Sequence, residues 1–119
     1  MTLRELDIKW GPIEFSSCTE NGEDMKQFFR EFRVALFSEC LKKHLISKCS
    51  LGHYYISGEI LDKHGNSVYY CISDVRTHTR LYPFKVMYRK DNKLPNQWCC
   101  LADLPSKAGE YIKKECVSC

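Results

Sequence analysis

The strongest periodic signal in the chain is an apolar stripe that recurs every three or four residues from Asp24 to about Ile46. Its apolar side chains fall within an arc of about 140° when each position turns by about 100°, which is typical of one face of an amphipathic helix. The stripe consists of Met25, Phe28, Phe29, Phe32, Ala35, Leu36 and Cys40. Acidic residues open the segment and lysines close it, an order that complements the helix dipole. The pattern predicts a long helix over 24–46, with Gly52 as the latest stop.

Alternating, tyrosine-rich segments predict an antiparallel sheet after this helix. Strands are expected at 53–61 and 67–75, because the turn between them contains Gly65, which can adopt the positive φ of a tight hairpin. Further strands are predicted at 84–89 and 97–100. Near the start of the chain, 7–15 also alternates around a Gly-Pro pair, which predicts an extended edge strand.

A second helix is predicted at the C-terminal end. Pro105 suits its first turn, and Asp103 is available as a cap. The predicted order is therefore β-α-β-β-β-(β)-α. We expect one α+β domain over 1–119, in which the long helix packs on a four- to five-stranded, mainly antiparallel sheet beside the C-terminal helix. A chain of 119 residues can bury a sufficient core for this.

The eight cysteines are expected to be free thiols. The chain opens without the apolar stretch of a secretory signal and contains no run that could span a bilayer, so a cytoplasmic location without membrane contact is expected. Cys40 and Cys71 lie in helical and strand patterns, where a thiol behaves as a small buried apolar group. Structural zinc is an alternative, because Cys116 and Cys119 have half-site spacing, and disulfides are another. The second cysteine pair of a zinc site is missing, so no metal or cofactor is predicted.

Positive charge is concentrated in two blocks. Residues 25–48 carry six basic and two acidic residues, and 76–95 carry six basic and one acidic residue, in a chain of net charge +3. On the helical wheel the first block forms a basic flank beside the apolar arc, with an aromatic residue inside it. The two blocks predict a partner-binding surface made of Arg30, Arg33, Phe37, Arg76, His78, Arg80, Tyr82, Lys85 and Arg89. Ordinary solvated charge is the competing interpretation.

A hydrolase or nuclease is a weaker hypothesis. Asp74, Arg76 and His78 would share one face of an extended segment, and His78 or His64 with Asp74 could serve as base and orienting group. This spacing is common in solvent-facing strands. No phosphate-binding glycine loop, dinucleotide fingerprint, nucleophile elbow or kinase motif is present, so no enzyme is predicted.

The tyrosines of the predicted sheet are a further candidate surface. Tyr69 and Tyr70 are adjacent, so alternation places them on opposite faces of the sheet, where an exposed ring could stack on a base or anchor a protein. Cross-strand pairing explains most of these tyrosines equally well.

Together these features favour a non-catalytic binding or inhibitory protein that occupies a surface of another macromolecule. The chain is similar in style to small inhibitors encoded by phages and mobile elements, which bind host defence machinery. We therefore expect a protein partner, most of all one that handles nucleic acid. Direct nucleic-acid binding through the basic helix flank and 76–90 is the alternative. Monomer and homodimer are both expected, the dimer by pairing of an exposed strand near Trp10 or Trp98.

Overall fold

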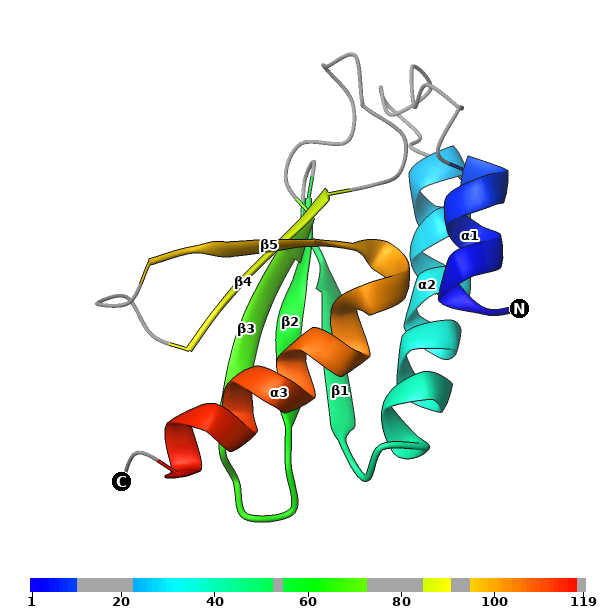
Figure 1. The fold of residues 1–119 in the computed structure, drawn as a ribbon. Helices are drawn as coiled ribbons and strands as arrows, with labels where there is room; N and C mark the ends of the chain where they lie inside the picture. Colours follow the sequence, from blue (N-terminus) through cyan, green and yellow to red (C-terminus); the bar gives the residue numbers. More distant parts are fainter. Residues whose placement is uncertain (11–22, 53–54, 73–84, 91–94, 118–119) are drawn as a thin grey trace.

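The computed structural model describes residues 1–10, 23–52, 55–72, 85–90 and 95–117, with the side chains of 23–25, 85 and 114–117 left aside (Figure 1). The elements in chain order are α1 (Leu3–Trp10), α2 (Glu23–Leu41), β1 (Ile46–Leu51), β2 (Ile56–Leu61), β3 (Ser67–Ile72), β4 (Lys85–Arg89), β5 (Gln97–Cys100), a 3₁₀ turn η1 (Leu101–Asp103) and α3 (Leu104–Val117).

The five strands form one antiparallel meander in which each strand pairs with its sequence neighbour, in the order β1-β2-β3-β4-β5. Two aromatic contacts show that α2 and α3 cover the same face. Phe32 of α2 packs edge-on against Tyr70, and Tyr111 of α3 packs edge-on against Tyr88. Tyr70 and Tyr88 are directly paired on β3 and β4 and so share this face, and no helix of the described residues lies on the opposite face (Figure 1). The predicted α+β class is confirmed.

The predicted strand at 7–15 is wrong for the part that the structure describes, because residues 3–10 form α1. Leu3, Leu6, Asp7 and Trp10 are buried at the i, i+3, i+4, i+7 spacing of a helix face. Four alternating residues fit a helix as well as a strand, and Ile8 is 58% exposed. Trp10, named as a possible dimer edge, therefore lies in a helix and not in a strand. Residues 11–15 lie outside the described chain.

A capping box begins α1. The Thr2 hydroxyl oxygen accepts the Glu5 backbone N–H at 3.1 Å, and the Glu5 carboxylate accepts the Thr2 backbone N–H at 2.9 Å. These reciprocal bonds satisfy two donors that the first turn would leave unpaired. The Thr-x-x-Glu spacing is visible in the sequence and could have identified this helix.

The long helix also ends earlier than predicted, and β1 occupies residues assigned to its end and the loop beyond. His44 has φ 61°, the left-handed conformation that usually favours glycine at a helix end. Its N–H bonds to the Leu41 carbonyl at 3.0 Å, and the Leu45 N–H bonds to the Cys40 carbonyl at 2.9 Å. These two bonds form a Schellman motif. A histidine at the glycine position explains why the stop was not predicted.

The remaining predictions agree more closely with the structure. The hairpin strands are β2 and β3, joined by a turn in which Gly65 has φ 85°. β4 and β5 lie where strands were predicted, with Trp98 on β5 at one edge of the sheet. Pro105 is the second residue of α3. Residues 53–54, 73–75 and 84 of the predicted strands lie outside the described chain.

Tyr70 connects three strands. Its ring is fully buried, and its hydroxyl donates to the Lys48 carbonyl oxygen on β1 at 2.9 Å, passing over Gly58 on the intervening strand β2. A methyl group on Gly58 would overlap that carbonyl and lie 2.7 Å from the tyrosine oxygen. Position 58 therefore requires glycine for space rather than for conformational freedom.

We predict that Gly58→Ala lowers the free energy of unfolding by at least about 2 kcal/mol, because backbone and a buried hydrogen bond would both have to shift. Gly109→Ala in α3 is the matched control. Its new methyl group would lie 3.5 Å from Leu45 Cδ1, an ordinary contact, and should stabilise the helix by up to about 1 kcal/mol. Chemical denaturation followed by circular dichroism measures the free energy of unfolding of both variants. Equal stability of the two variants would contradict this account of Gly58.

Candidate functional site

The helix α2 is apolar on two opposite faces. One face is the predicted stripe, of which Phe28, Phe32, Ala35, Leu36 and Cys40 are buried. The other face carries Val34, Phe37 and Leu41, which are 65%, 42% and 46% exposed. They follow the i, i+3, i+7 spacing of a single line along the helix. An amphipathic helix at a protein surface normally carries polar residues there, so this line, the α2 ridge, requires an explanation.

The α2 ridge borders a shallow groove against β1. Residues of both elements surround an open volume of about 460 Å³: Arg33, Val34, Phe37, Ser38 and Leu41 from the helix, and Ser47 and Cys49 from the strand. β1 is the first strand of the sheet, so within the described chain its outer edge pairs with no other strand. The groove thus combines an apolar helix face with a strand edge that can still form hydrogen bonds.

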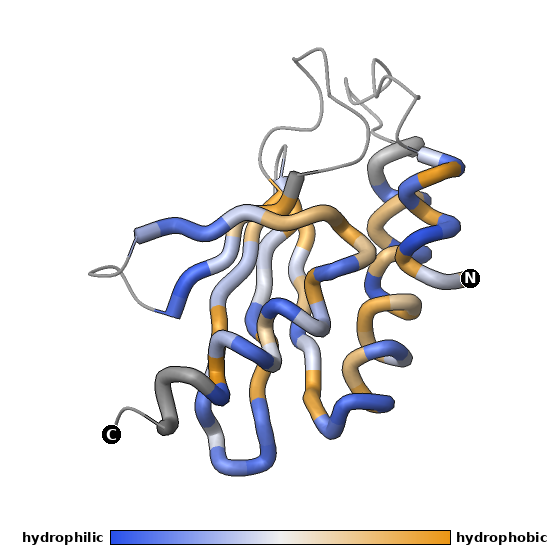
Figure 2. Tube along the Cα trace, viewed as in Figure 1, coloured by the Kyte–Doolittle hydropathy of each residue, from blue (hydrophilic) through white to orange (hydrophobic). Residues whose placement is uncertain are grey.

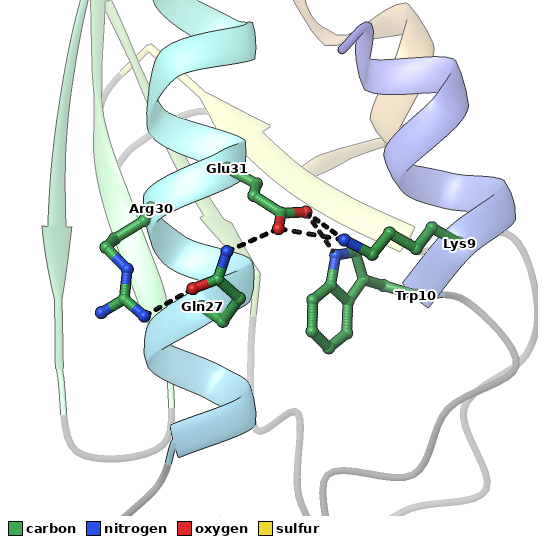
Figure 3. Close-up of polar contacts among 5 residues, drawn as sticks. All are labelled: Lys9, Trp10, Gln27, Arg30 and Glu31. Carbon is green, nitrogen blue, oxygen red and sulfur yellow. Dashed lines mark hydrogen bonds and ion pairs between the residues drawn. The ribbon is translucent and has the colours of Figure 1, made fainter.

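A chain of polar contacts positions Arg30 beside this surface (Figure 3). The Glu31 carboxylate accepts hydrogen bonds from Lys9 Nζ at 3.0 Å and Trp10 Nε1 at 2.9 Å, both on α1. It also accepts the Gln27 Nε2 amide at 2.6 Å, and Gln27 Oε1 accepts Arg30 Nη2 at 2.5 Å. Glu31 therefore fixes the orientation of the Gln27 amide, and that amide in turn holds the arginine.

These contacts divide the charges of α2 between its two sides. Glu31 points to α1, and Glu39 accepts the Leu3 backbone N–H of α1 at 2.6 Å. Arg30 and Arg33 lie on the exposed side, with the Arg33 guanidinium 5.8 Å from the Phe29 ring centroid. The α2 ridge is therefore flanked by two cations, while the helix carboxylates described by the structure are occupied elsewhere.

The uncovered face of the sheet carries a separate aromatic and cationic pair. The Arg89 guanidinium lies 5.5 Å from the Tyr69 ring centroid, and Arg89 Nη1 donates to Asn96 Oδ1 at 3.3 Å. Tyr69 is partly exposed and its neighbour Tyr70 is buried under the helices, so the predicted alternation is confirmed. Arg89 thus lies on the opposite face of the sheet from the residues of α2.

The structure places four of the nine predicted partner-binding residues with their side chains: Arg30, Arg33 and Phe37 on α2, and Arg89 on β4. Lys85 begins β4, and its side chain lies outside the described set. Arg76, His78, Arg80 and Tyr82 also lie outside the described residues, as does Asp74. Val34 and Leu41 complete the ridge, although the sequence placed them only beside the basic flank.

The cysteine side chains that the structure describes are free thiols: Cys40, Cys49, Cys71, Cys99 and Cys100. Burial raises the pKa of Cys40 and of Cys99 to about 12, so both are protonated at neutral pH. Cys40 and Cys71 are buried, as predicted. Within the described chain, no group of three or more His, Cys, Asp or Glu side chains could hold a metal ion. The side chains of Cys116 and Cys119 are outside that set.

No family model matches this chain, and searches of curated proteins and of solved structures also found no match. None of the described helices has the length and apolar character needed to cross a membrane. Function therefore has to be inferred from the chain's own residues.

Glu31 provides a test of how α1 is held against α2. Burial tends to raise its pKa, but hydrogen bonds from Gln27, Trp10 and Lys9 outweigh this, and the pKa lies below the ordinary 4.5. A depressed carboxylate pKa stabilises the fold above the unfolded-state value and ceases to do so as pH falls through the folded-state value. The stabilisation by Glu31 is therefore complete at neutral pH, declines once the pH falls below the ordinary 4.5, and is lost as the pH passes the lower folded-state pKa.

We predict that Glu31→Gln in a Trp98→Phe background shifts Trp10 fluorescence to longer wavelength and lowers stability by about 1 kcal/mol at pH 7. Trp98→Phe removes the exposed indole of the other tryptophan, so the emission comes from Trp10, which is only 6% exposed. The difference from the parent should vanish as pH falls below 4.5, the ordinary glutamate pKa. Glu59→Gln on the exposed surface of β2 is the control. Identical spectra and stability for the Glu31 variant and its parent would refute the role given to this carboxylate.

Proposed function

We propose that this protein is a non-catalytic binding protein that occupies the surface of a partner protein through the α2 ridge. The supporting observation is the second apolar face of α2, where Val34, Phe37 and Leu41 stay exposed in one line. A helix that is apolar on both sides is typical of a buried helix, and a partner would supply the missing cover. An inhibitory effect, as in the phage and mobile-element proteins of similar style, would follow if the covered surface is one the partner needs.

The chemistry of the ridge favours a protein over a nucleic acid. Val34 and Leu41 offer no hydrogen bond to a phosphate or a base edge, whereas an aromatic residue flanked by arginine is typical of the energetic centre of protein interfaces. Arg30 and Arg33 would complement acidic side chains around an apolar contact. The partner that fits is therefore a protein with an acidic, partly apolar surface.

A partner that handles nucleic acid fits this description only at an acidic face. Grooves that bind phosphate are themselves cationic and would repel Arg30 and Arg33. The same repulsion between like ridges disfavours a homodimer through this surface. The proposal includes a cytoplasmic location, which suits the free thiols of the described chain.

Direct nucleic-acid binding is the second candidate, and the Tyr69–Arg89 pair is the observation that favours it. An aromatic ring and a guanidinium on an uncovered sheet face can stack on unpaired bases. Such binding should weaken steeply as salt is added, whereas an interface centred on Phe37 should not. Hydrolysis by His78 or His64 with Asp74 gains no support, because two of these three residues lie outside the described chain.

We predict that a Phe37→Ser/Arg33→Glu variant loses at least about tenfold in affinity for the partner, because an interface loses its aromatic anchor and a charge becomes repulsive. The first measurement is affinity capture from a native lysate, with and without nuclease, followed by binding titration of the captured protein. An Ile8→Ser/Lys107→Glu variant is the matched control, because it also replaces one exposed apolar residue and reverses one exposed cation.

The proposal is supported if one discrete protein is still captured after nuclease treatment, binds the parent and the control variant with equal affinity, and does not bind the ridge variant. Retention of that protein by the ridge variant would exclude this surface. Nucleic acid retained alone and lost on nuclease treatment would instead favour the second candidate. The ridge variant should remain folded and lose at most about 2 kcal/mol of stability, since Phe37 is 42% exposed and Arg33 is exposed.

A further inference from the structure

A second cavity lies where three segments distant in sequence meet at one end of the sheet. It is lined by Lys43, His44 and Leu45 after α2, by Asp62, Lys63 and His64 in the β2–β3 turn, and by Ser106, Gly109, Glu110, Ile112 and Lys113 of α3. Its volume is about 730 Å³, within the range of about 300 to 1,000 Å³ typical of small-molecule sites. It shares no lining residue with the groove beside the α2 ridge. We refer to it as the α3 pocket.

The floor of the α3 pocket is apolar. Leu45 and Ile112 are 5% and 3% exposed and belong to the core cluster, so their positions are set by packing. The Schellman motif that ends α2 holds Leu45 there through its N–H bond to the Cys40 carbonyl at 2.9 Å. Gly109 of α3 lies against Leu45, since a methyl group at position 109 would be 3.5 Å from Leu45 Cδ1. The floor is therefore a small apolar area that packing fixes in place, and the edge of an apolar group can contact it.

The rim is cationic. Lys43, Lys63 and Lys113 reach it from three separate elements, and all three are exposed. Figure 2 shows the two turns that supply the first two as hydrophilic segments at the same end of the sheet. Three lysines against two carboxylates, Asp62 and Glu110, leave a formal charge of +1 with neutral histidines.

One of the two carboxylates is already occupied. The Asp62 oxygens accept the backbone N–H groups of His64 and Asn66 at 2.9 Å each and the Asn66 side-chain amide at 3.1 Å. Burial tends to raise the pKa of Asp62, but together these hydrogen bonds outweigh it and hold that pKa below its ordinary value. Asp62 therefore organises the turn that carries Lys63 and His64, and among the described residues no ion pair joins it to a lysine of the rim.

We propose that the α3 pocket binds a small organic phosphate, with its apolar body on Leu45 and Ile112 and its phosphate among Lys43, Lys63 and Lys113. Lysine suits this group because it acts as a compact point charge and phosphate carries nearly two negative charges at neutral pH. The pocket lining contains no arginine, so its lysines are the permanently charged cations available to an anion. The imidazoles of His44 and His64 line the same rim and can donate to phosphate oxygens.

Phenyl phosphate is the simplest probe with both parts, and inorganic phosphate and phenol are the probes that carry one part each. We predict that phenyl phosphate binds with a dissociation constant of about 0.1 to 1 mM and shifts the NMR amide signals of residues 43–45, 62–64 and 109–113. Inorganic phosphate and phenol should each bind at least about tenfold more weakly. Added salt should weaken the binding of phenyl phosphate, because ions screen the charges of the exposed rim.

Variants separate this site from general attraction to a basic protein. The double variant Lys43→Ala/Lys113→Ala should bind phenyl phosphate at least about tenfold more weakly, because it removes two charge-assisted contacts. Lys107→Ala, an exposed lysine of α3 outside the pocket lining, should leave the affinity unchanged. The proposal is overturned if phenyl phosphate causes no saturable shift at these residues up to about 10 mM, or if both variants lose affinity equally. Equal binding of inorganic phosphate would overturn the role of the apolar floor.

Discussion

The hydrogen bond from the Tyr70 hydroxyl to the Lys48 carbonyl is the contact on which the arrangement of the structure depends. It crosses β2 at Gly58 and joins β3 to β1 at 2.9 Å, while the Tyr70 ring meets Phe32 of α2. Burial raises the pKa of this tyrosine far above its ordinary value, so the hydroxyl stays protonated and remains a donor at any physiological pH. One side chain thereby links β1, the centre of the sheet and the long helix.

Both candidate sites follow from where β1 and α2 are held. The groove beside the α2 ridge exists because β1 runs back along the helix as the first strand of the sheet. The α3 pocket exists because the turn between the same two elements brings Leu45 under α3. A change in the α2–β1 connection would therefore alter both surfaces. Changes in the exposed side chains Phe37 or Lys113 would alter only one each.

Periodicity was sufficient for the elements that carry most of the core. The apolar stripe of α2, the β2–β3 hairpin and α3 were predictable because each shows one clear period and a turn or proline signal. α1 and β1 were not, since a short alternating segment fits either structure and His44 ends α2 without glycine. Phe37 was predictable as an aromatic residue outside the buried stripe because it lies off the apolar arc. The α3 pocket was not, because its three segments meet only through the sheet's topology.

Helix spacing and α1 together give α2 its charge asymmetry. Neither Arg30 nor Arg33 has a glutamate three or four residues away, so Glu31 and Glu39 lie on other sides of the helix. Packing against α1 draws Glu31 to Lys9 and Trp10 and draws Glu39 to the backbone of Leu3. The cations on the other side then lack nearby carboxylates of their own helix, apart from any the structure does not describe. A short N-terminal helix thus engages the carboxylates of α2 on one side, and on the other side the proposed acidic partner would meet Arg30 and Arg33 around the apolar ridge.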